Sequence, residues 1–159
     1  MKNDIKKIYS LTGLQSGIFH SKLKDSESSS YHLQTEMIVA LELSEEQIKE
    51  ALNLLSYQYE VLRTAFVLPE STGVPKQVIL TEREIPLEVL AFQIETLASE
   101  MEQYKEKDLK RGFDLQKDSL IRVATVLSKS ETYFIISVHH IILDGWSFNL
   151  LLNAFVNIL

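Results

Sequence analysis

The chain has 159 residues, of which 45% are hydrophobic and 24% charged, a composition typical of one globular domain and not of a disordered or fibrous protein. Its formal net charge of −6 argues against a nucleic-acid partner, because phosphate binding needs a cationic surface. The absence of cysteine excludes disulfides, thiol nucleophiles and Cys-bearing zinc sites, and no N-terminal apolar segment is long enough for a signal peptide or a membrane span, so we expect a cytoplasmic protein.

The first third of the sequence predicts a helix, a loop and a strand. Apolar residues recur at helical spacing over 11–23 behind Thr12, which is a suitable N-cap. The polar stretch 24–30 is typical of a surface loop. Apolar and polar residues then alternate over 31–43, which is the pattern of a strand with one buried face.

The middle of the chain predicts two helices separated by strands. Ser44 and Gln47 form a capping box, so we expect a helix over 45–61. The run 63–68 and the end of 71–80 are β-rich and flank a Gly/Pro turn, which predicts a hairpin, and 86–92 adds an edge strand. A solvated amphipathic helix follows over 93–110 and ends near Gly112.

The last third contains two β-rich runs, 120–130 and 131–140, joined by a polar turn, and then an apolar helix over 146–159. These elements predict an α+β or mixed α/β sandwich, a central sheet with flanking helices. The chain ends inside the apolar helix without a polar tail, so we expect that it was cut from a longer protein.

The stretch SVHHIILDGWS, residues 137–147, carries the candidate chemistry. Alternation along the strand places Ser137 and His139 on one face and Val138 and His140 on the other, so only one histidine faces a given cleft. Asp144 and Gly145 then break the strand before the helix.

Several site chemistries can be compared at this strand-to-helix corner. A metal site is disfavoured because the two histidines diverge and only His20 and His32 remain as further histidine ligands. A serine hydrolase lacks its G-x-S-x-G elbow and a phosphate loop lacks its glycines. Two interpretations stay open on spacing alone: acid/base work by one neutral imidazole, as in acyl transfer, or two hydrogen-bonded structural histidines, which spacing favours.

Three segments together resemble the condensation domains of nonribosomal peptide synthetases. SLTGLQSGIFHSKL, residues 10–23, is similar to the family's first motif, LTPLQEGMLFH, with Gly13 and Ser16 in place of Pro and Glu. YEVLRTAF, residues 59–66, is similar to RHExLRTxF but has Gln58 and Tyr59 in place of Arg and His. The third segment matches HHxxxDG completely, and GFDLQKDSLIRV resembles the segment that precedes it in the family.

The order and spacing of the three motifs favour a condensation domain over its relatives. HHxxxDG alone is shared with chloramphenicol acetyltransferase-like acyltransferases and with epimerisation domains. Trp146 and Ser147 after Asp-Gly differ from the DGVSWR of epimerisation domains, and both histidines are intact, unlike in the cyclisation variant.

The resemblance implies roles for individual residues. His140 would be catalytic, either as a base toward the attacking amine or as the group that positions it, and Gly145 would allow close backbone approach at the reacting carbonyl. His139 would serve the fold. Asp144 would be structural and would form a buried ion pair with Arg63, so that Arg63→Ala harms folding more than chemistry.

The resemblance also implies a fold and partners. The family's domain is a V of two chloramphenicol acetyltransferase-like lobes, and residues 1–159 would be the N-terminal lobe. It would join acyl or peptidyl donors to aminoacyl acceptors, both carried as phosphopantetheine thioesters on upstream and downstream peptidyl carrier proteins, in antibiotic-type secondary metabolism. We expect no directly bound cofactor, metal, nucleic acid or membrane, and no activity of this lobe without the C-terminal lobe.

Two finer expectations and two rival functions complete the hypothesis. The first and third motifs resemble the subtype that accepts a D-configured donor, and residues 1–9 resemble segments that dock an upstream synthetase subunit, with an engineered chain end as the alternative. The rivals are a lobe of a coenzyme A-dependent acyltransferase of the same superfamily and a non-catalytic carrier-protein docking module.

Overall fold

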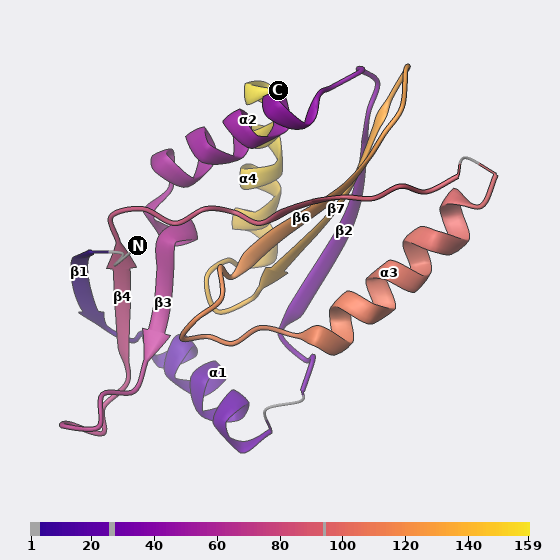
Figure 1. The fold of residues 1–159 in the computed structure, drawn as a ribbon. Helices are drawn as coiled ribbons and strands as arrows, with labels where there is room; N and C mark the ends of the chain where they lie inside the picture. Colours follow the sequence, from indigo (N-terminus) through magenta and orange to yellow (C-terminus); the bar gives the residue numbers. More distant parts are fainter. Residues whose placement is uncertain (1–3, 26–27, 94) are drawn as a thin grey trace.

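The structure is a computed structural model that describes residues 4–25, 28–93 and 95–159 (Figure 1). The strands are β1 (Ile5–Ser10), β2 (His32–Val39), β3 (Thr64–Val67), β4 (Lys76–Leu80), β5 (Leu87–Val89), β6 (Ile121–Leu127) and β7 (Thr132–His139). The helices are α1 (Gly13–Lys24), α2 (Glu45–Gln58), α3 (Leu97–Arg111) and α4 (Gly145–Ile158), with a 3-10 turn at Glu60–Arg63. The expected mixed α/β class is confirmed.

Two sheets organise the chain. The larger has the strand order β2-β7-β6-β5, in which β2, β7 and β6 are antiparallel neighbours and β5 is a parallel edge strand. The smaller sheet has the order β1-β4-β3 and is antiparallel throughout. Both the β3–β4 hairpin and the short edge strand that the sequence predicts are present.

The larger sheet is covered on both faces, as Figure 1 shows: α3 lies on one side, and α2 and α4 lie on the other. Because side chains alternate along each strand, β7 sends Phe134, Ile136 and Val138 into the main core with α1, α2 and α4. Ile135 faces the opposite way and packs with Leu97 and Met101 of α3. Strand β7 is therefore buried over nearly its whole length and holds its C-terminal end between two packed layers.

Capping boxes set the starts of α1 and α2, as the sequence predicts. Thr12 accepts from the Gln15 backbone N–H while the Gln15 side chain accepts from the Thr12 backbone, and Ser44 and Gln47 repeat this pattern. Each box supplies two of the hydrogen-bond partners that a helix N-terminus lacks.

Some element boundaries differ from the sequence expectation. Helix α2 ends at Gln58 and not at residue 61, because Tyr59 is extended and the following 3-10 turn buries Leu62 without continuing the α-helix. Helix α3 begins at Leu97, four residues later than expected, and Ile94 lies outside the described residues. Strand β2 ends at Val39, because the chain bends after it, although Leu43 still reaches the core.

The N-terminal residues 5–10 form β1, which pairs with β4. The docking role expected for 1–9 stays a prediction, and residues 1–3 lie outside the described part, as do residues 26 and 27 of the expected loop. Among the residues described, no helix combines the length and apolar character needed to span a bilayer.

Candidate active site

The HHIILDG segment forms the corner between β7 and α4, as the sequence predicts. Strand β7 ends at His139, and Asp144 is the N-cap of α4. The backbone N–H of Ile142 donates to the carbonyl of His139 at 3.1 Å and closes the turn between them. His140 lies one residue beyond the strand, so the turn sets its direction and strand alternation does not.

His139 is buried at the end of the strand. Its ring lies edge-on to Phe113, with centroids 6.0 Å apart, and 6.3 Å from the ring of Tyr31. Burial, followed by the nearby charges of Lys22, His32 and His140, lowers the pKa of His139 to about 4. A neutral, enclosed imidazole fits the structural role that the resemblance implies for it.

His140 is half-buried and is held through its backbone. Its N–H donates to the carbonyl of Tyr31 at 2.8 Å, so the residue preceding β2 fixes the position of its main chain. Its Nδ1 atom is buried and has no hydrogen-bond partner within the described part of the chain. Because Nδ1 is buried, a bound reactant would have to meet the ring at Nε2.

The expected ion pair between Arg63 and Asp144 is wrong for the described structure. Arg63 is buried and donates to backbone carbonyls, from Nε to Leu80 at 3.2 Å and from one terminal nitrogen to Tyr57 at 2.8 Å and to Ser56. Asp144 is exposed and accepts the backbone N–H of Ser147 at 2.7 Å. Backbone carbonyls satisfy the guanidinium, and the helix N-terminus satisfies the carboxylate.

Asp144 thus holds the corner as a helix cap. The hydrogen bonds from Ser147 lower its pKa, and the charge of His140 contributes in the same direction. Gly145 is the first helical residue, and a Cβ added there would meet no atom within 4 Å. The chain itself leaves this position open, so close approach of a reactant to Gly145 stays a prediction.

Gln15 connects the first motif to the third across 126 residues. Its Oε1 caps α1 at Thr12, and its Nε2 donates to the carbonyl of Ile141 at 3.4 Å. One side chain therefore fixes both the start of α1 and the turn that carries His140.

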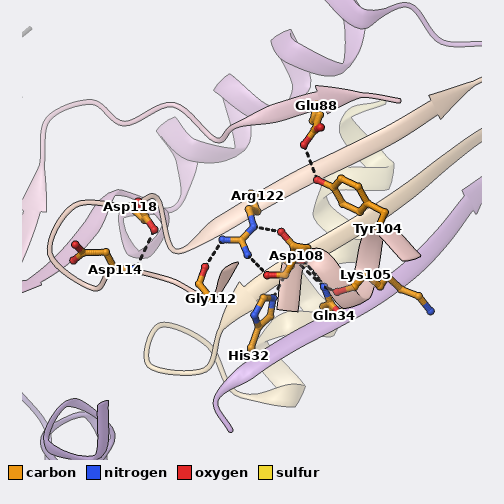
Figure 2. A network of polar contacts seen from close by, with 11 residues as sticks. His32, Gln34, Glu88, Tyr104, Lys105, Asp108, Gly112, Asp114, Asp118 and Arg122 are labelled. Atoms are coloured by element: carbon orange, nitrogen blue, oxygen red, sulfur yellow. Dashed lines mark hydrogen bonds and ion pairs between the residues drawn. The ribbon is translucent and has the colours of Figure 1, made fainter. Parts of the chain in front are cut away.

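Sequence reasoning missed a buried polar cluster beside the site, drawn in Figure 2. It joins Asp108 of α3 to Arg122 of β6 and to Gln34 and His32 of β2. The available signal was Arg122 itself, a charge inside the apolar run LIRVATV, because a buried charge requires a buried partner. No group of three or more potential metal ligands gathers among the described residues.

A groove of about 320 Å³ opens next to the site, between the C-terminal end of α1 and the segment that follows α3. Phe19, Leu23, Phe113 and Leu115 form its apolar part. Lys22, Lys110 and Arg111 add positive charge at its lining, and Asp114 adds one negative charge. An anion with an apolar or amide tail would be complementary to this lining.

Comparison with known proteins decides the family: the sequence-family model described as Condensation domain matches residues 5–159. The chain belongs to the condensation domain family. The second subunit of surfactin synthase from Bacillus subtilis (strain 168) is 35% identical over 96% of this chain, and Gramicidin S synthase 2 of Brevibacillus brevis is 34% identical over 99%. The family resemblance drawn from the three motifs is thereby confirmed.

Solved structures show the condensation-domain fold. The crystal structure of the first condensation domain of the CDA synthetase superposes with a TM-score of 0.84 at 18% identity, over 98% of this chain and 40% of that one. The starter condensation domain of rhizomide synthetase RzmA gives a TM-score of 0.83 at 19% identity, over 96% of this chain and 39% of that one. The chain spans only 4% of the length of each of the two synthetases named above.

Proposed function

We propose that this chain is the N-terminal lobe of a condensation domain that forms a peptide bond between two carrier-bound thioesters, with His140 as the residue that acts on the attacking amine. The observation that supports this most directly is the HHxxxDG corner of a condensation-family chain, which fixes the backbone of His140 at the Tyr31 carbonyl while the side chain stays half-buried. An imidazole at this corner is of the chemical type that can accept or orient an amine proton.

The carriers and their arms belong to the same proposal. A phosphopantetheine arm combines an anionic phosphate with a slender amide chain, and the groove lined by Lys22, Lys110 and Arg111 beside apolar residues is complementary to it. Holding two such arms together would supply most of the rate, because positioning two reactants is worth effective molarities of about 10⁵ M or more. We expect no coupling by this lobe alone, because in the proposed function a second lobe supplies the opposite wall of the site.

The test compares the parent condensation domain with its His140→Ala variant, using one donor-loaded and one acceptor-loaded carrier protein. We expect the variant to lose coupling, measured as condensed thioester by mass spectrometry, while its melting temperature and its carrier affinity stay at the parent values. Coupling at the parent rate in the variant would contradict the proposed role. Turnover with coenzyme A thioesters in place of carrier thioesters would favour the acyltransferase instead.

We further propose the D-donor subtype, on the first motif LTGLQSGIFH and the LDGWS of the third. The parent domain should couple a D-configured donor faster than its L-epimer on the same carrier. A preference for the L-epimer would refute the subtype and leave the condensation function untouched.

A further inference from the structure

The polar cluster under α3 is organised around one carboxylate. One oxygen of Asp108 accepts from Nε of Arg122, and the other accepts from Ser137 at 2.6 Å and from Gln34 at 2.8 Å (Figure 2). Nε2 of His32 lies 3.3 Å from that second oxygen, within ion-pair distance but without hydrogen-bond alignment. Four strand side chains, one of them an arginine, therefore converge on a single helix residue.

The cluster is buried and charged. Asp108 and Arg122 are 4% and 5% exposed. Burial raises the pKa of Asp108, but the interactions with His32, Arg122 and Ser137 outweigh it and lower the pKa below its usual value. These partners hold α3 in one position on the sheet. A shift of the helix would leave the buried carboxylate charged and without its partners, which is costly.

Arg122 connects Asp108 to His139 through Gly112 and Phe113. A terminal nitrogen donates to the carbonyl of Gly112 at 2.8 Å, and the guanidinium carbon lies 4.0 Å from the centre of the Phe113 ring. The ring of Phe113 in turn packs nearly perpendicular to the ring of His139, with 6.0 Å between centroids. The guanidinium that pairs with Asp108 thus fixes one wall of the His139 pocket.

Strand β2 connects Asp108 to the backbone of His140. His32 lies directly opposite His139 in the β2–β7 register, and its ring also contacts Phe113 at 4.9 Å between centroids. The preceding residue, Tyr31, accepts the backbone N–H of His140 at 2.8 Å. The contact of His32 with Asp108 therefore lies one residue from the bond that holds the candidate catalytic histidine.

We propose that Asp108 is a positioning residue of the condensation site: through Arg122 and Phe113 it orients His139, and through His32 and β2 it fixes the backbone of His140. The effect on turnover rests on the proposed function of His140, whereas the effect on the two histidine rings does not. Asp108 itself is buried between α3 and the sheet, so in this proposal it acts through its neighbours.

The test uses Asp108→Asn, which keeps the shape of the side chain but turns one acceptor oxygen into an N–H donor. Whichever way the amide is oriented, that donor faces Arg122 on one side or Gln34 and His32 on the other. Two matched variants on the same helix serve as controls. Met101→Ala loosens the packing of α3 without touching the cluster, and Glu102→Gln removes a carboxylate from an exposed ion pair with Lys105.

Two measurements separate positioning from stability. Nitrogen NMR of the histidine rings in the 159-residue chain reports tautomer and mobility without turnover, and steady-state coupling in the parent domain gives kcat and KM. We expect Asp108→Asn to disturb the ring signals of His139 and His140 and to lower kcat about tenfold to a hundredfold at nearly constant KM. Glu102→Gln should leave both unchanged.

The comparison with Met101→Ala decides the inference. If Asp108→Asn and Met101→Ala, compared at equal distance below their melting temperatures, show the same ring signals and the same kcat, Asp108 serves stability alone and the inference is overturned. If the rings respond only to Asp108→Asn while the parent domain fails to couple any substrate, the positioning inference holds and the proposed function fails. If Asp108→Asn has the histidine ring signals and the kcat of the parent, the positioning role is refuted and the proposed function is unaffected.

Discussion

The backbone N–H of Ile141 donates to Nδ1 of His139 at 3.2 Å, so this ring nitrogen is an acceptor and the proton of the neutral imidazole lies on Nε2. His20 has the opposite arrangement, because its Nδ1 lies 2.7 Å from the carbonyl of Ser16 and a carbonyl only accepts. The two rings therefore have different fixed tautomers in one chain.

This difference gives a first prediction, which nitrogen NMR of the rings at alkaline pH can check. We expect His139 to show a protonated Nε2 and His20 a protonated Nδ1. Identical tautomer patterns for both rings would contradict the described geometry of the corner. The His20 signal is the internal control, since it lies on the exposed side of α1.

The second prediction concerns Arg63 and its backbone partners. Arg63→Ala removes the buried guanidinium that donates hydrogen bonds to the carbonyls of Leu80 and Tyr57. We expect the free energy of unfolding to fall by about 3 kcal/mol, because hydrogen bonds from a charged group are worth more than neutral ones. Urea denaturation of parent and variant measures this, and a variant as stable as the parent would contradict it.

Asp144 supplies the third prediction, which tests the corrected pairing. Asp144→Ala removes a helix cap and should cost about 1 kcal/mol, whereas Asp144→Asn keeps an acceptor for Ser147 and should cost less. Combined with Arg63→Ala, the losses should add to within about 0.5 kcal/mol, since the two residues share no contact among those described. A larger coupling energy would support an ion pair between Arg63 and Asp144 and contradict the described geometry.

The fourth prediction concerns the dependence of stability on pH. The pKa of His139 is lowered to about 4 in the folded chain, so between the unfolded value near 6.5 and pH 4 the unfolded chain binds the extra proton. The contribution of His139 to the free energy of unfolding should therefore be fully present above pH 6.5. It should be lost as the pH drops toward 4, a change of up to about 3 kcal/mol. The carboxylates whose pKa is lowered, Glu46, Glu60, Asp108 and Asp144, lose their contributions only below about pH 4.5.

Denaturation midpoints at pH 5 and pH 7 measure this effect. The parent should be more stable at pH 7, and His139→Gln should flatten the difference whatever its absolute stability. An equally steep dependence in His139→Gln would assign the effect to another group.

Gly112 gives the fifth prediction. It ends α3 with φ of 62° and ψ of −156°, a region that L side chains rarely adopt, and its carbonyl receives Arg122. A Cβ there would meet only Lys22 Nζ at 3.7 Å, so the cost of Gly112→Ala is backbone strain and not a clash. We expect a loss of about 1 to 3 kcal/mol by urea denaturation, whereas Gly145→Ala should cost much less, since its backbone is helical and open.

The parts of the fold that the sequence predicts are those that depend on neighbours along the chain. Thr12 with Gln15 and Ser44 with Gln47 are three residues apart, so the helix starts could be predicted from local chemistry alone. The strand-to-helix corner at 139–145 follows from the same kind of pattern. The end of α2 was missed because Leu62 keeps the apolar period although the backbone has already left the α-helix.

The parts that could not be predicted depend on partners far apart in sequence. Arg63 and Asp144 each have a choice between an opposite charge and nearby backbone groups, and the backbone satisfies both. Asp108 lies in a helix full of charges, where a carboxylate is normally exposed, and only the folded sheet places Arg122 against it. His32 likewise looked like one more residue of an alternating strand.

The side-chain amide of Gln15 accepts at one end and donates at the other, and it uses both at once: its oxygen caps α1 and its nitrogen reaches the Ile141 carbonyl. No other side chain of that length offers both functions without a charge, since glutamate would repel the carbonyl and lysine could not cap the helix. A single residue thus makes the start of the first helix and the turn beside the candidate catalytic histidine depend on each other. Loss of that amide would remove both hydrogen bonds at once, and with them this direct link between two segments far apart in the sequence.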